Sequence, residues 1–584
     1  MKHANETMKR TLLLSLAGAA LLAAACAKPA CTTVGERPVD FQKLNAQAAR
    51  EYLIPVRPGV PGGQPFWNAY SIKFTYAPAF DFPEADGASS YRFDLWKIDD
   101  VWGTVWYTDP EQRPRPQAQK DKYSAGGAPV RSFTASSPKA DLSPVWADLP
   151  VANYALVVTA TGPDGKDLEP VGSREFLRDF PFEGPYPEAC RGYRDAAMMA
   201  LRFNHRQPLV RKIQSLQEGE KFETSNIFAS KFLGAIIRSE LLMAKYLPTY
   251  REECLRNARK TADILISIAQ PEGTPLAHIT PTYYDSYVQD KNAVNNGEVN
   301  GMNVTDLQAQ TMALDPLNAL NGYLDLFDAT GEAKYYDEAY AMMKTYDRLV
   351  DETGFLPKKL YIATGKGVSD AGALTGFLLL VIQRFHNQYG VTDFDPLARR
   401  CESWMNRNLL DRFEMSAQFE DVSVFQKPYQ NLSNIMPNQY ARYLLQKERV
   451  TNEEMILAKD MIRFVEDQFV HWALPRDKDG LFYCLVPGTF EQYACSITID
   501  ASNAHTANTL MALYKKTGDP LLYEKARAQL NTIVNSQAVN GEIATFMGLD
   551  YGGAGGGFWI NCSTFSALSL LAFIGDEALE LTGM

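Results

Sequence analysis

The sequence predicts a mainly α-helical fold, an (α/α)6 toroid, preceded by a small antiparallel β-sandwich domain. Three observations predict it. Residues 65–182 hold short runs rich in β-branched and aromatic residues, separated by turn signals. From about residue 193 onward, apolar residues recur at helical spacing instead. The helical part also repeats a two-helix unit about six times, which is typical of a ring of hairpins.

The first residues have the features of a targeting segment. Lys9 and Arg10 precede an apolar run that is too short to cross a bilayer as a helix, so residues 1–25 are predicted to be a signal peptide. The small residues before Cys26 resemble a bacterial lipobox, although Ala23 stands where Leu is more usual. We therefore expect an exported protein that touches a membrane only through a lipid on Cys26, with residues 26–64 as tether. The alternative is cleavage after Ala25 without a lipid.

The β-sandwich domain is predicted to span residues 65–185. Strands are expected at residues 70–76, 91–98, 101–108 and 154–161, with Asp-Gly turns between some of them. The stretch LPVANYALVVTATGPDG resembles the strand-and-turn pattern of fibronectin type III and immunoglobulin-like domains. We expect this domain to carry no chemistry and its tryptophans to lie in the core rather than bind sugar.

Residues 186–584 are predicted to form the toroid. The first helix of each unit is apolar on all sides, as a buried inner helix should be, and the second carries more charge. In two units the first helix stops at a Thr-Gly pair, with Gly331 and Gly518 at the stop. The links from each second helix to the next first helix are long, so in a toroid they meet at one end. Loops of more than about 12 to 15 residues are usually functional, and we expect one pocket there.

The links carry aromatic rings that can stack on sugar faces, and amides that can bind hydroxyl groups. The predicted substrate-binding residues are Tyr284, Asn296, Tyr429, Trp472, Tyr483, Gln492, Tyr493, Asn503, His505, Tyr551 and Trp559. For each loop aromatic, the alternative is that the ring only holds its loop in place. For His505, the alternative is a structural histidine inside a helix.

Hydrolysis of a glycosidic bond needs one protonated and one ionised carboxyl group. The predicted catalytic residues are Glu420 or Asp421, in QFEDVSVFQKPYQ, and Glu491, in PGTFEQYACSITID. Both segments surround the acid with aromatic residues, and loss of hydration there raises the pKa of a carboxyl group. Asp500 is a further acid, but its position before a helical run favours a helix N-cap.

Three segments, EDQFVHW, FEDVS and FEQYACSITIDASNA, resemble segments of exported six-hairpin glycosidase-like proteins. That group includes β-glucuronidases and unsaturated-glucuronyl hydrolases. The resemblance covers roughly residues 190–584 and implies a glycoside hydrolase that acts on an oligo- or polysaccharide containing uronic acid. Basic residues of the links would then neutralise the uronate, or else remain solvated loop charges: Lys358, Lys359, Lys366, Lys427 and Arg476.

Two other functions stay open at this point. A polysaccharide lyase or a uronate epimerase on the same toroid would need a Tyr or His base, and the candidate pairs are Tyr493 with His505 and Tyr284 with His278. A glycan-binding lipoprotein without catalysis would instead present a flat aromatic ledge.

The composition excludes some partners. The net charge of -11 argues against nucleic acid. None of the eight cysteines has the spacing of a metal site, so no metal and no cofactor is predicted. Cys484 and Cys495 either pair across their loop or are small buried residues. The sequence does not specify the oligomeric state.

Overall fold

The computed structural model describes residues 39–56, 70–99, 115–287, 298–299, 302–303, 309–408, 415–420, 422–427, 429–473, 485–547 and 557–582. The chain divides into two compact units, Met1–Lys43 and Leu44–Met584, and all contacts discussed below lie in the second. The signal peptide, Cys26 and most of the tether lie outside the described residues, and the predicted domain boundaries stay predictions. Within the described residues, no helix combines the length and the apolar character that a membrane crossing requires.

The β region is built on a five-stranded sheet in the order β1-β7-β6-β3-β4. Its neighbouring strands are antiparallel, except that β1 runs parallel to β7. Beside it, β2 and β5 form a two-stranded antiparallel sheet. The strands are β1 (Lys73–Phe74), β2 (Ala79–Asp81), β3 (Ser90–Ile98), β4 (Arg131–Ala135), β5 (Lys139–Asp141), β6 (Ala152–Thr161) and β7 (Asp167–Arg178). The helices of this region are α2 (Phe41–Glu51), α4 (Pro116–Ser124) and α5 (Ser143–Trp146).

The predicted strands at residues 91–98 and 154–161 are confirmed as β3 and β6, and residues 70–76 contain the shorter β1. The predicted strand at residues 101–108 lies outside the described residues. The sequence did not indicate β7, because this strand begins with exposed charged residues and contains Pro170. Trp96 and Trp146 are buried, as expected for core tryptophans.

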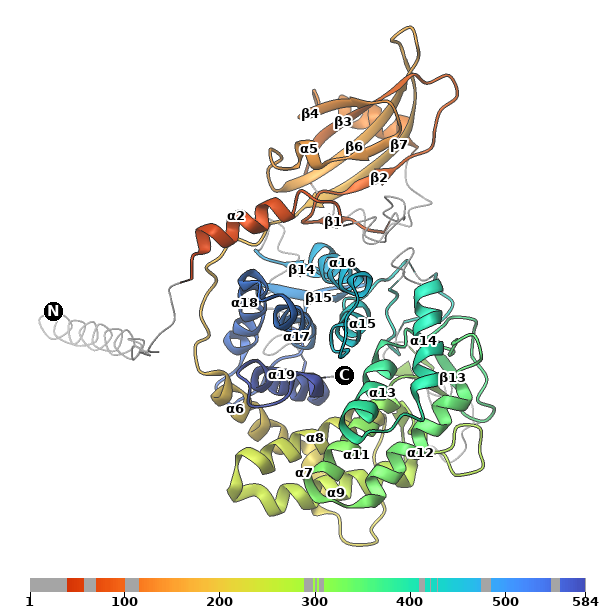
Figure 1. Cartoon of the computed structure of the whole chain (residues 1–584), viewed down its shortest axis with the longest axis vertical. Coiled ribbons are helices and arrows are strands. Elements are labelled where there is room, and N and C mark those ends of the chain that lie inside the picture. The colour runs from red at the N-terminus through yellow and green to blue at the C-terminus, as the bar shows by residue number, and fades with distance from the viewer. Residues whose placement is uncertain are drawn as a thin grey trace, which may run out of the picture. The chain divides into compact units, whose positions relative to one another are not determined.

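Helices dominate from α6 onward, and in the described residues they alternate between an outer and an inner ring. The inner helices are α8 (Ala229–Tyr246), α11 (Pro316–Thr330), α13 (Gly376–Tyr389), α15 (Ile435–Leu445), α17 (Asp500–Thr517) and α19 (Ile560–Phe573). Each of them packs against the next, and α19 packs against α8, so the ring is closed (Figure 1). The outer helices are α6 (Tyr193–His205), α9 (Arg251–Ile268), α12 (Ala333–Leu349), α14 (Asp395–Asn408), α16 (Asn452–Phe469) and α18 (Pro520–Ser536).

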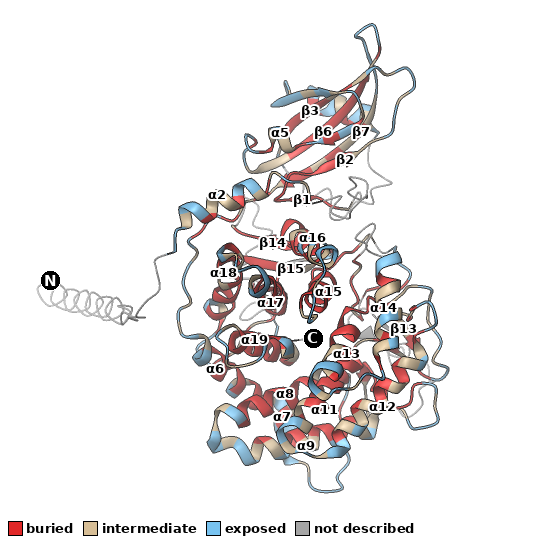
Figure 2. Ribbon diagram, viewed as in Figure 1, coloured by how far each residue is buried: buried red, intermediate tan, exposed pale blue. Residues whose placement is uncertain are grey.

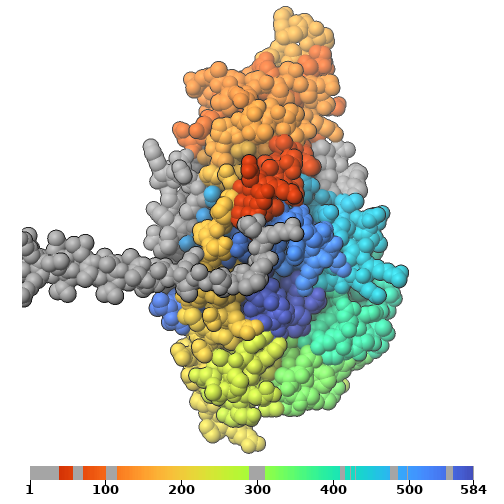
Figure 3. Space-filling model, turned by 60° about the vertical axis from the view of Figure 1, so that its left-hand side comes forward, coloured from red at the N-terminus to blue at the C-terminus, as the bar shows by residue number. Residues whose placement is uncertain are grey.

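This arrangement confirms the predicted (α/α)6 toroid. The sequence shows only the first helix of the sixth hairpin, α19, and its outer partner is α6, which comes before all other hairpins in the chain. In the space-filling view, the last helical segment, in dark blue, accordingly lies against the yellow segment at which the helical region begins (Figure 3). The ring closes because α19 has an apolar surface that only another helix can bury.

Inner and outer helices differ in burial as their sequences predict. The inner helices are buried almost all round, whereas the outer helices expose one side (Figure 2). The turns inside the hairpins are short. Gly331 and Gly518 end α11 and α17 at φ +72° and +69°, a left-handed conformation that glycine adopts without a steric cost.

The links between hairpins contain the remaining short elements. They are α7 (Pro208–Ser215), β8 (Ile227–Phe228), β9 (Tyr283–Tyr284), β10 (Glu298–Val299), β11 (Met302–Asn303), β12 (Gln310–Met312), β13 (Lys359–Tyr361), β14 (Val470–His471), β15 (Gly488–Gln492) and β16 (Cys495–Thr498). Two short helical turns lie elsewhere: η2 (Pro248–Tyr250) is in the turn between α8 and α9, and η3 (Leu579–Thr582) follows α19. The strands β14, β15 and β16 form one antiparallel sheet in the link between α16 and α17.

Candidate active site

A cavity of about 710 Å³ lies at the end of the toroid where the inner helices begin. Each of the six inner helices contributes a residue from its first turns: Lys231, Asn318, Phe377, Gln439, His505 and Asn561. The long links before α11, α15, α17 and α19 supply much of the remaining wall. Helix N-termini carry unpaired N–H groups and a partial positive charge, so this end of the ring stabilises anionic groups.

Lys231 lies at the centre of the charged groups in this cavity. Its Nζ donates to Glu420 Oε2 at 2.5 Å and lies 3.7 Å from Asp315 Oδ1. Burial lowers the pKa of Lys231, but the charges of Asp315 and Glu420 outweigh burial and hold the pKa above its ordinary value. Lys231 therefore stays charged and pairs with two acids at once.

Asp315 is the carboxyl group of this cavity that titrates near neutral pH. Burial raises its pKa to about 6; Lys231 opposes this shift and Glu420 adds to it. The residue immediately precedes α11 but makes no side-chain capping hydrogen bond. The sequence does not single out Asp315 as a site residue, since Asp before Pro at the start of an apolar run is typical of a helix N-cap. The signal that could have identified Asp315 is its place at the end of a long link, just before α11.

Glu491 reaches the cavity from β15 and is half-buried. Its main-chain oxygen accepts hydrogen bonds from Ser433 Oγ at 2.7 Å and from Asn434 N at 3.1 Å. On the next residue, Gln492 Oε1 accepts from Asn431 Nδ2 at 2.8 Å. The link that carries Glu420 is thereby bonded directly to the strand that carries Glu491, a role of residues 431–434 that the sequence did not reveal.

Of two candidate residues on α17, His505 lies in the cavity, whereas Asp500 does not have the N-cap role expected of it. His505 lines the cavity, packs its ring 4.3 Å from that of Phe565, and is neutral because burial, together with the charge of Arg442, holds its pKa well below the ordinary value. Asp500 is not the N-cap of α17, which is Ile499. Instead Asp500 Oδ2 accepts from Ser566 Oγ at 2.9 Å, and burial raises the pKa of Asp500 to about 8.

The structure brings together five of the predicted site residues. Those that line the one cavity are Glu420, Glu491, Gln492, His505 and Trp559. Trp559 also packs against the ring of Phe228, with ring centroids 4.9 Å apart. It therefore both holds its link in place and lines the cavity. Four predicted site residues, Asp421, Asn296, Tyr483 and Tyr551, lie outside the described residues.

Three predicted substrate contacts are corrected, because their polar atoms are taken up in the interior. Trp472 is 1 % exposed and donates from Nε1 to Glu466 Oε1 at 3.0 Å. Tyr493 is 5 % exposed and donates its hydroxyl to Gln468 Oε1 at 2.8 Å. Asn503 is fully buried, and its Oδ1 accepts from Thr489 N at 2.7 Å.

Two further predicted aromatics lie away from the cavity wall. Tyr284 stacks on Phe222 with ring centroids 6.4 Å apart. Tyr429 packs beside Tyr70 at 6.0 Å. Both contacts fit the alternative stated for loop aromatics, in which the ring holds a link in place.

Within the described residues, the group of side chains close enough to share a metal ion lies outside the cavity. It consists of His205, Glu240 and Cys254, whose ligand atoms are within 4.8 Å of one another. His205 Nδ1 lies 2.8 Å from Glu240 Oε1, and Asn257 Nδ2 donates to Glu240 Oε2 at 3.0 Å. These contacts satisfy the buried carboxylate by hydrogen bonding alone.

No family model and no curated protein matches the chain. Solved structures do match, at low identity. A family 76 glycoside hydrolase from a bovine Bacteroides thetaiotaomicron strain is 10 % identical, with 85 % of this chain and 95 % of that chain covered and a TM-score of 0.42. A sugar epimerase from a ruminal bacterium is 10 % identical over 65 % of this chain and 99 % of its own, with a TM-score of 0.43. An unsaturated glucuronyl hydrolase specific for heparin is 11 % identical over 66 % and 98 %, with a TM-score of 0.41. Similarity at this level assigns no activity to the chain.

Proposed function

We propose that the chain is a glycan-processing enzyme, a glycoside hydrolase that works through the carboxyl groups of the cavity. One observation carries the proposal: Asp315, which titrates near pH 6, shares the cavity with Glu420 and Glu491. Hydrolysis of a glycosidic bond requires one carboxyl group that holds a proton and one that does not. The cavity offers three carboxyl groups from side chains on separate links, and burial raises the pKa of one of them, Asp315.

The contacts of each acid suggest its role. Asp315 is the proton donor to the leaving oxygen, because its raised pKa keeps a protonated fraction near neutral pH. We assign Glu491, which reaches the cavity from β15, as the second carboxyl group of the reaction. Glu420 has one oxygen occupied by Lys231, so it holds Lys231 in place and sets the charge beside Asp315. Neutral His505 offers a hydrogen bond to a sugar hydroxyl.

The dimensions and lining of the cavity suit a short stretch of glycan. Its volume of about 710 Å³ falls in the range of small-molecule sites. Trp559 and Phe419 offer ring faces, while Gln439 and Asn561 offer amides for hydroxyl groups. A cavity with three acids is not needed for glycan capture alone, which argues against a binding protein without catalysis.

The charge of the cavity favours a neutral sugar at the reacting position over the uronate expected from the sequence. Of the basic link residues named for that role, Lys358 and Lys359 donate to the main-chain oxygens of Ala417 and Glu420. Among the described residues that line the cavity, Lys231 is the cationic one, and two acids already neutralise it. The positive helix N-termini are the observation that keeps a uronate as the second candidate.

A lyase or epimerase reaction is a weaker candidate. Of its proposed pairs, Tyr493 does not line the cavity that holds His505, and His278 Nδ1 lies 3.1 Å from Glu338. Of the Tyr and His bases that such a reaction was expected to use, His505 alone is among the described residues of the cavity wall.

A matched set of substrates tests these alternatives. Aryl glycosides of neutral sugars and of the corresponding uronic acids are incubated with the full chain, followed by a panel of polysaccharides. The proposal predicts new reducing ends, no ultraviolet absorbance from an unsaturated product, and a preference for the neutral sugars. An unsaturated product would establish the lyase, and binding without turnover would leave a glycan-binding protein.

We also propose export and anchoring through Cys26, which the targeting segment of the sequence supports. Metabolic labelling with a fatty acid tests the anchor. Label is expected on the natural chain and absent from a Cys26→Ser variant.

A further inference from the structure

One short segment of the β region, residues 70–76, runs along the links that build the cavity. It contains β1, which pairs with the end of β7, so that Asp179 N donates to Phe74 O at 2.9 Å. This pairing places Lys73 Nζ 3.5 Å from Asp179 Oδ2. Both side chains are buried, so the pair is fixed inside the protein rather than on its surface.

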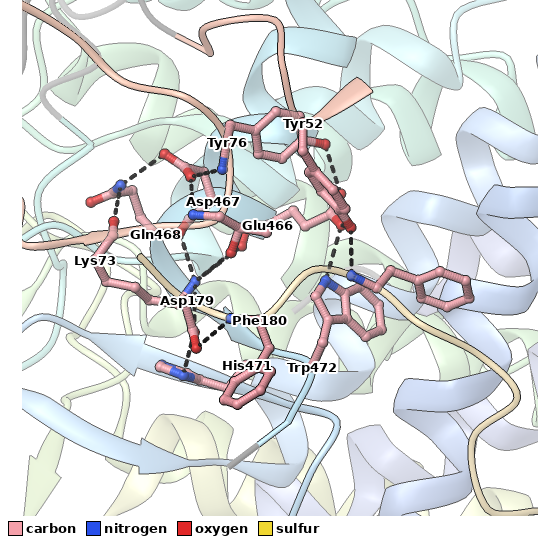
Figure 4. Close-up of polar contacts among 12 residues, drawn as sticks. Tyr52, Lys73, Tyr76, Asp179, Phe180, Glu466, Asp467, Gln468, His471 and Trp472 are labelled. Carbon is pink, nitrogen blue, oxygen red and sulfur yellow. Dashed lines mark hydrogen bonds and ion pairs between the residues drawn. The ribbon is translucent and has the colours of Figure 1, made fainter. Parts of the chain in front are cut away.

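The segment is bonded to the last turn of α16. Asp467 Oδ1 accepts from Thr75 N at 2.7 Å and from Tyr76 N at 2.8 Å, and Lys73 Nζ donates to Asp467 O at 2.7 Å (Figure 4). Gln468 Nε2 donates to Lys73 O at 2.7 Å. The end of α16, from which β14 starts, is thereby held by the β region.

Asp179 continues this contact into β14. Its Oδ2 lies 2.8 Å from His471 Nδ1 (Figure 4). Burial opposes ionisation of Asp179, but His471 and Lys73 hold its pKa below the ordinary value, so the carboxylate is charged. His471 pairs with Gly488 of β15, and its ring lies 4.1 Å from that of Phe490, the residue before Glu491.

The β region also contacts the chain after Glu491 through Ser71, and the link of Glu420 through Tyr70, and we call these contacts the second arm. Ser71 Oγ lies 3.0 Å from the hydroxyl of Tyr493, two residues after Glu491. The hydroxyl of Tyr70 accepts from Gln430 Nε2 at 2.9 Å, in the link that carries Glu420. The β region thus contacts the chain on both sides of Glu491, and also contacts the link of the second acid.

We propose that Asp179 is a positioning residue for Glu491. Asp179 holds His471 and thereby fixes β14. Because β14 pairs with β15, it fixes the register of β15 and the position of Glu491 in the cavity. The role of Glu491 rests on the proposed function. A site tolerates little displacement, since a shift of about 1 Å can cost roughly 10²-fold in rate. The β region is therefore a part of the site's framework, contrary to the expectation that it carries no share in the chemistry.

The test compares Asp179→Asn with Asp325→Asn in the full chain. Asp325 is the control, because it is also an ion-paired carboxylate; it is half-buried and paired with Arg238 and Arg384 on the toroid. Hydrogen exchange is measured on residues 488–493, together with Tm, kcat and KM on a glycoside substrate. We expect Asp179→Asn to speed exchange in residues 488–493 several-fold and lower kcat about 10- to 100-fold with little change in KM. Asp325→Asn should lower Tm without either change.

Hydrogen exchange does not depend on turnover, so the positioning role of Asp179 and the proposed glycoside hydrolase function are tested separately. If no glycan is cleaved by the natural chain, the proposed function falls, while exchange still tests the positioning. Unchanged exchange in Asp179→Asn, equal exchange in both variants, or faster exchange with unchanged kcat each overturn the positioning role. If Asp179→Asn does not fold, Ser71→Ala removes only a hydroxyl from the second arm and should give a smaller rise in exchange over the same residues.

Discussion

The two ends of the toroid use the same helices in opposite ways. At the end where the inner helices begin, the connections are long and enclose the cavity. At the other end, the hairpin turns are short. Several inner helices end there at a glycine, such as Gly331, Gly390 and Gly518. Function is concentrated at the first end because connection length, and not the helices, supplies room for side chains of many kinds.

The charges at the two ends follow the helix dipoles. Acids gather where helices begin: Asp315, Glu420 and Glu491. Arginines lie toward the end where helices finish: Arg442 donates to the main-chain oxygens of Thr582 and Leu579 in η3, and Arg238 donates to Leu581 O. These acids and arginines lie toward the helix ends that stabilise them, whereas Lys231 and Asp325 lie toward the opposite ends and are held by ion pairs instead. The comparison teaches that one end is built for reactive acids and the other for closure.

The largest effect is expected from Glu491→Gln. Loss of the ionised carboxylate should lower kcat about 10³-fold, within the range found for positioned acid–base groups. The change is nearly isosteric, and the main-chain bonds to Ser433 and Asn434 remain, so Tm should stay within about 1 °C. Full turnover in this variant would remove Glu491 from the mechanism. Steady-state kinetics and thermal unfolding of the same preparation decide it.

Asp315→Asn should lower kcat about 10²-fold and also change the dependence of stability on pH. Because the pKa of Asp315 is raised to about 6, the folded state holds its proton more tightly than the unfolded state. The stability that this proton provides is lost as pH rises toward 6 and above, by up to about 3 kcal/mol. The variant should therefore gain stability relative to the natural chain across this range. Urea unfolding from pH 4 to 8 measures the difference, and parallel curves would contradict it.

Removal of residues 579–584 should affect stability and leave chemistry intact. Arg442, which is fully buried, would lose the acceptors of η3. An unpaired buried charge typically costs about 3 kcal/mol or more. Arg442→Met in the shortened chain should recover part of that loss, and kcat of the folded fraction should not change. A truncation that lowers kcat while leaving the free energy of unfolding unchanged would reverse the assigned roles of the two ends.

The smallest effect is expected at a hairpin turn. Gly518 has φ +69° and open space around the position of an added Cβ, so Gly518→Ala introduces backbone strain alone. The cost should be about 1 kcal/mol. Gly518→Asn should cost less, because Asn tolerates the left-handed conformation better. Both variants should keep kcat, as measured beside their thermal unfolding curves.

The fold was predictable because helix periodicity and short glycine turns are local signals. The pairing of α19 with α6 was not, since these helices lie at opposite ends of the helical region and no local pattern pairs them. The long strand β7 was missed for a related reason. It begins with exposed charged residues, and its pairing with β6 depends on tertiary structure that the local pattern does not show.

Link position was a sufficient signal to bring Glu420 and Glu491 into one cavity, and their roles stay predictions. Link position failed for Trp472 and Tyr493, because the sequence does not show that the β region packs over these rings. Ser71 lies 3.0 Å from the hydroxyl of Tyr493, a contact between residues 422 positions apart. Burial by a distant segment decides between a sugar platform and a core aromatic, and that information is absent from the local pattern.

The assignment of Asp315 as proton donor is tested most directly by varying the leaving group. An alkyl glycoside needs protonation of the departing oxygen. A dinitrophenyl glycoside does not, because dinitrophenolate departs without being protonated. Asp315→Asn should therefore lose turnover of the alkyl glycoside but recover most of it on the dinitrophenyl glycoside, while Glu491→Gln should lose both. Equal loss on the two substrates for Asp315→Asn would contradict the account that Asp315 is the proton donor beside Glu491 at this end of the toroid.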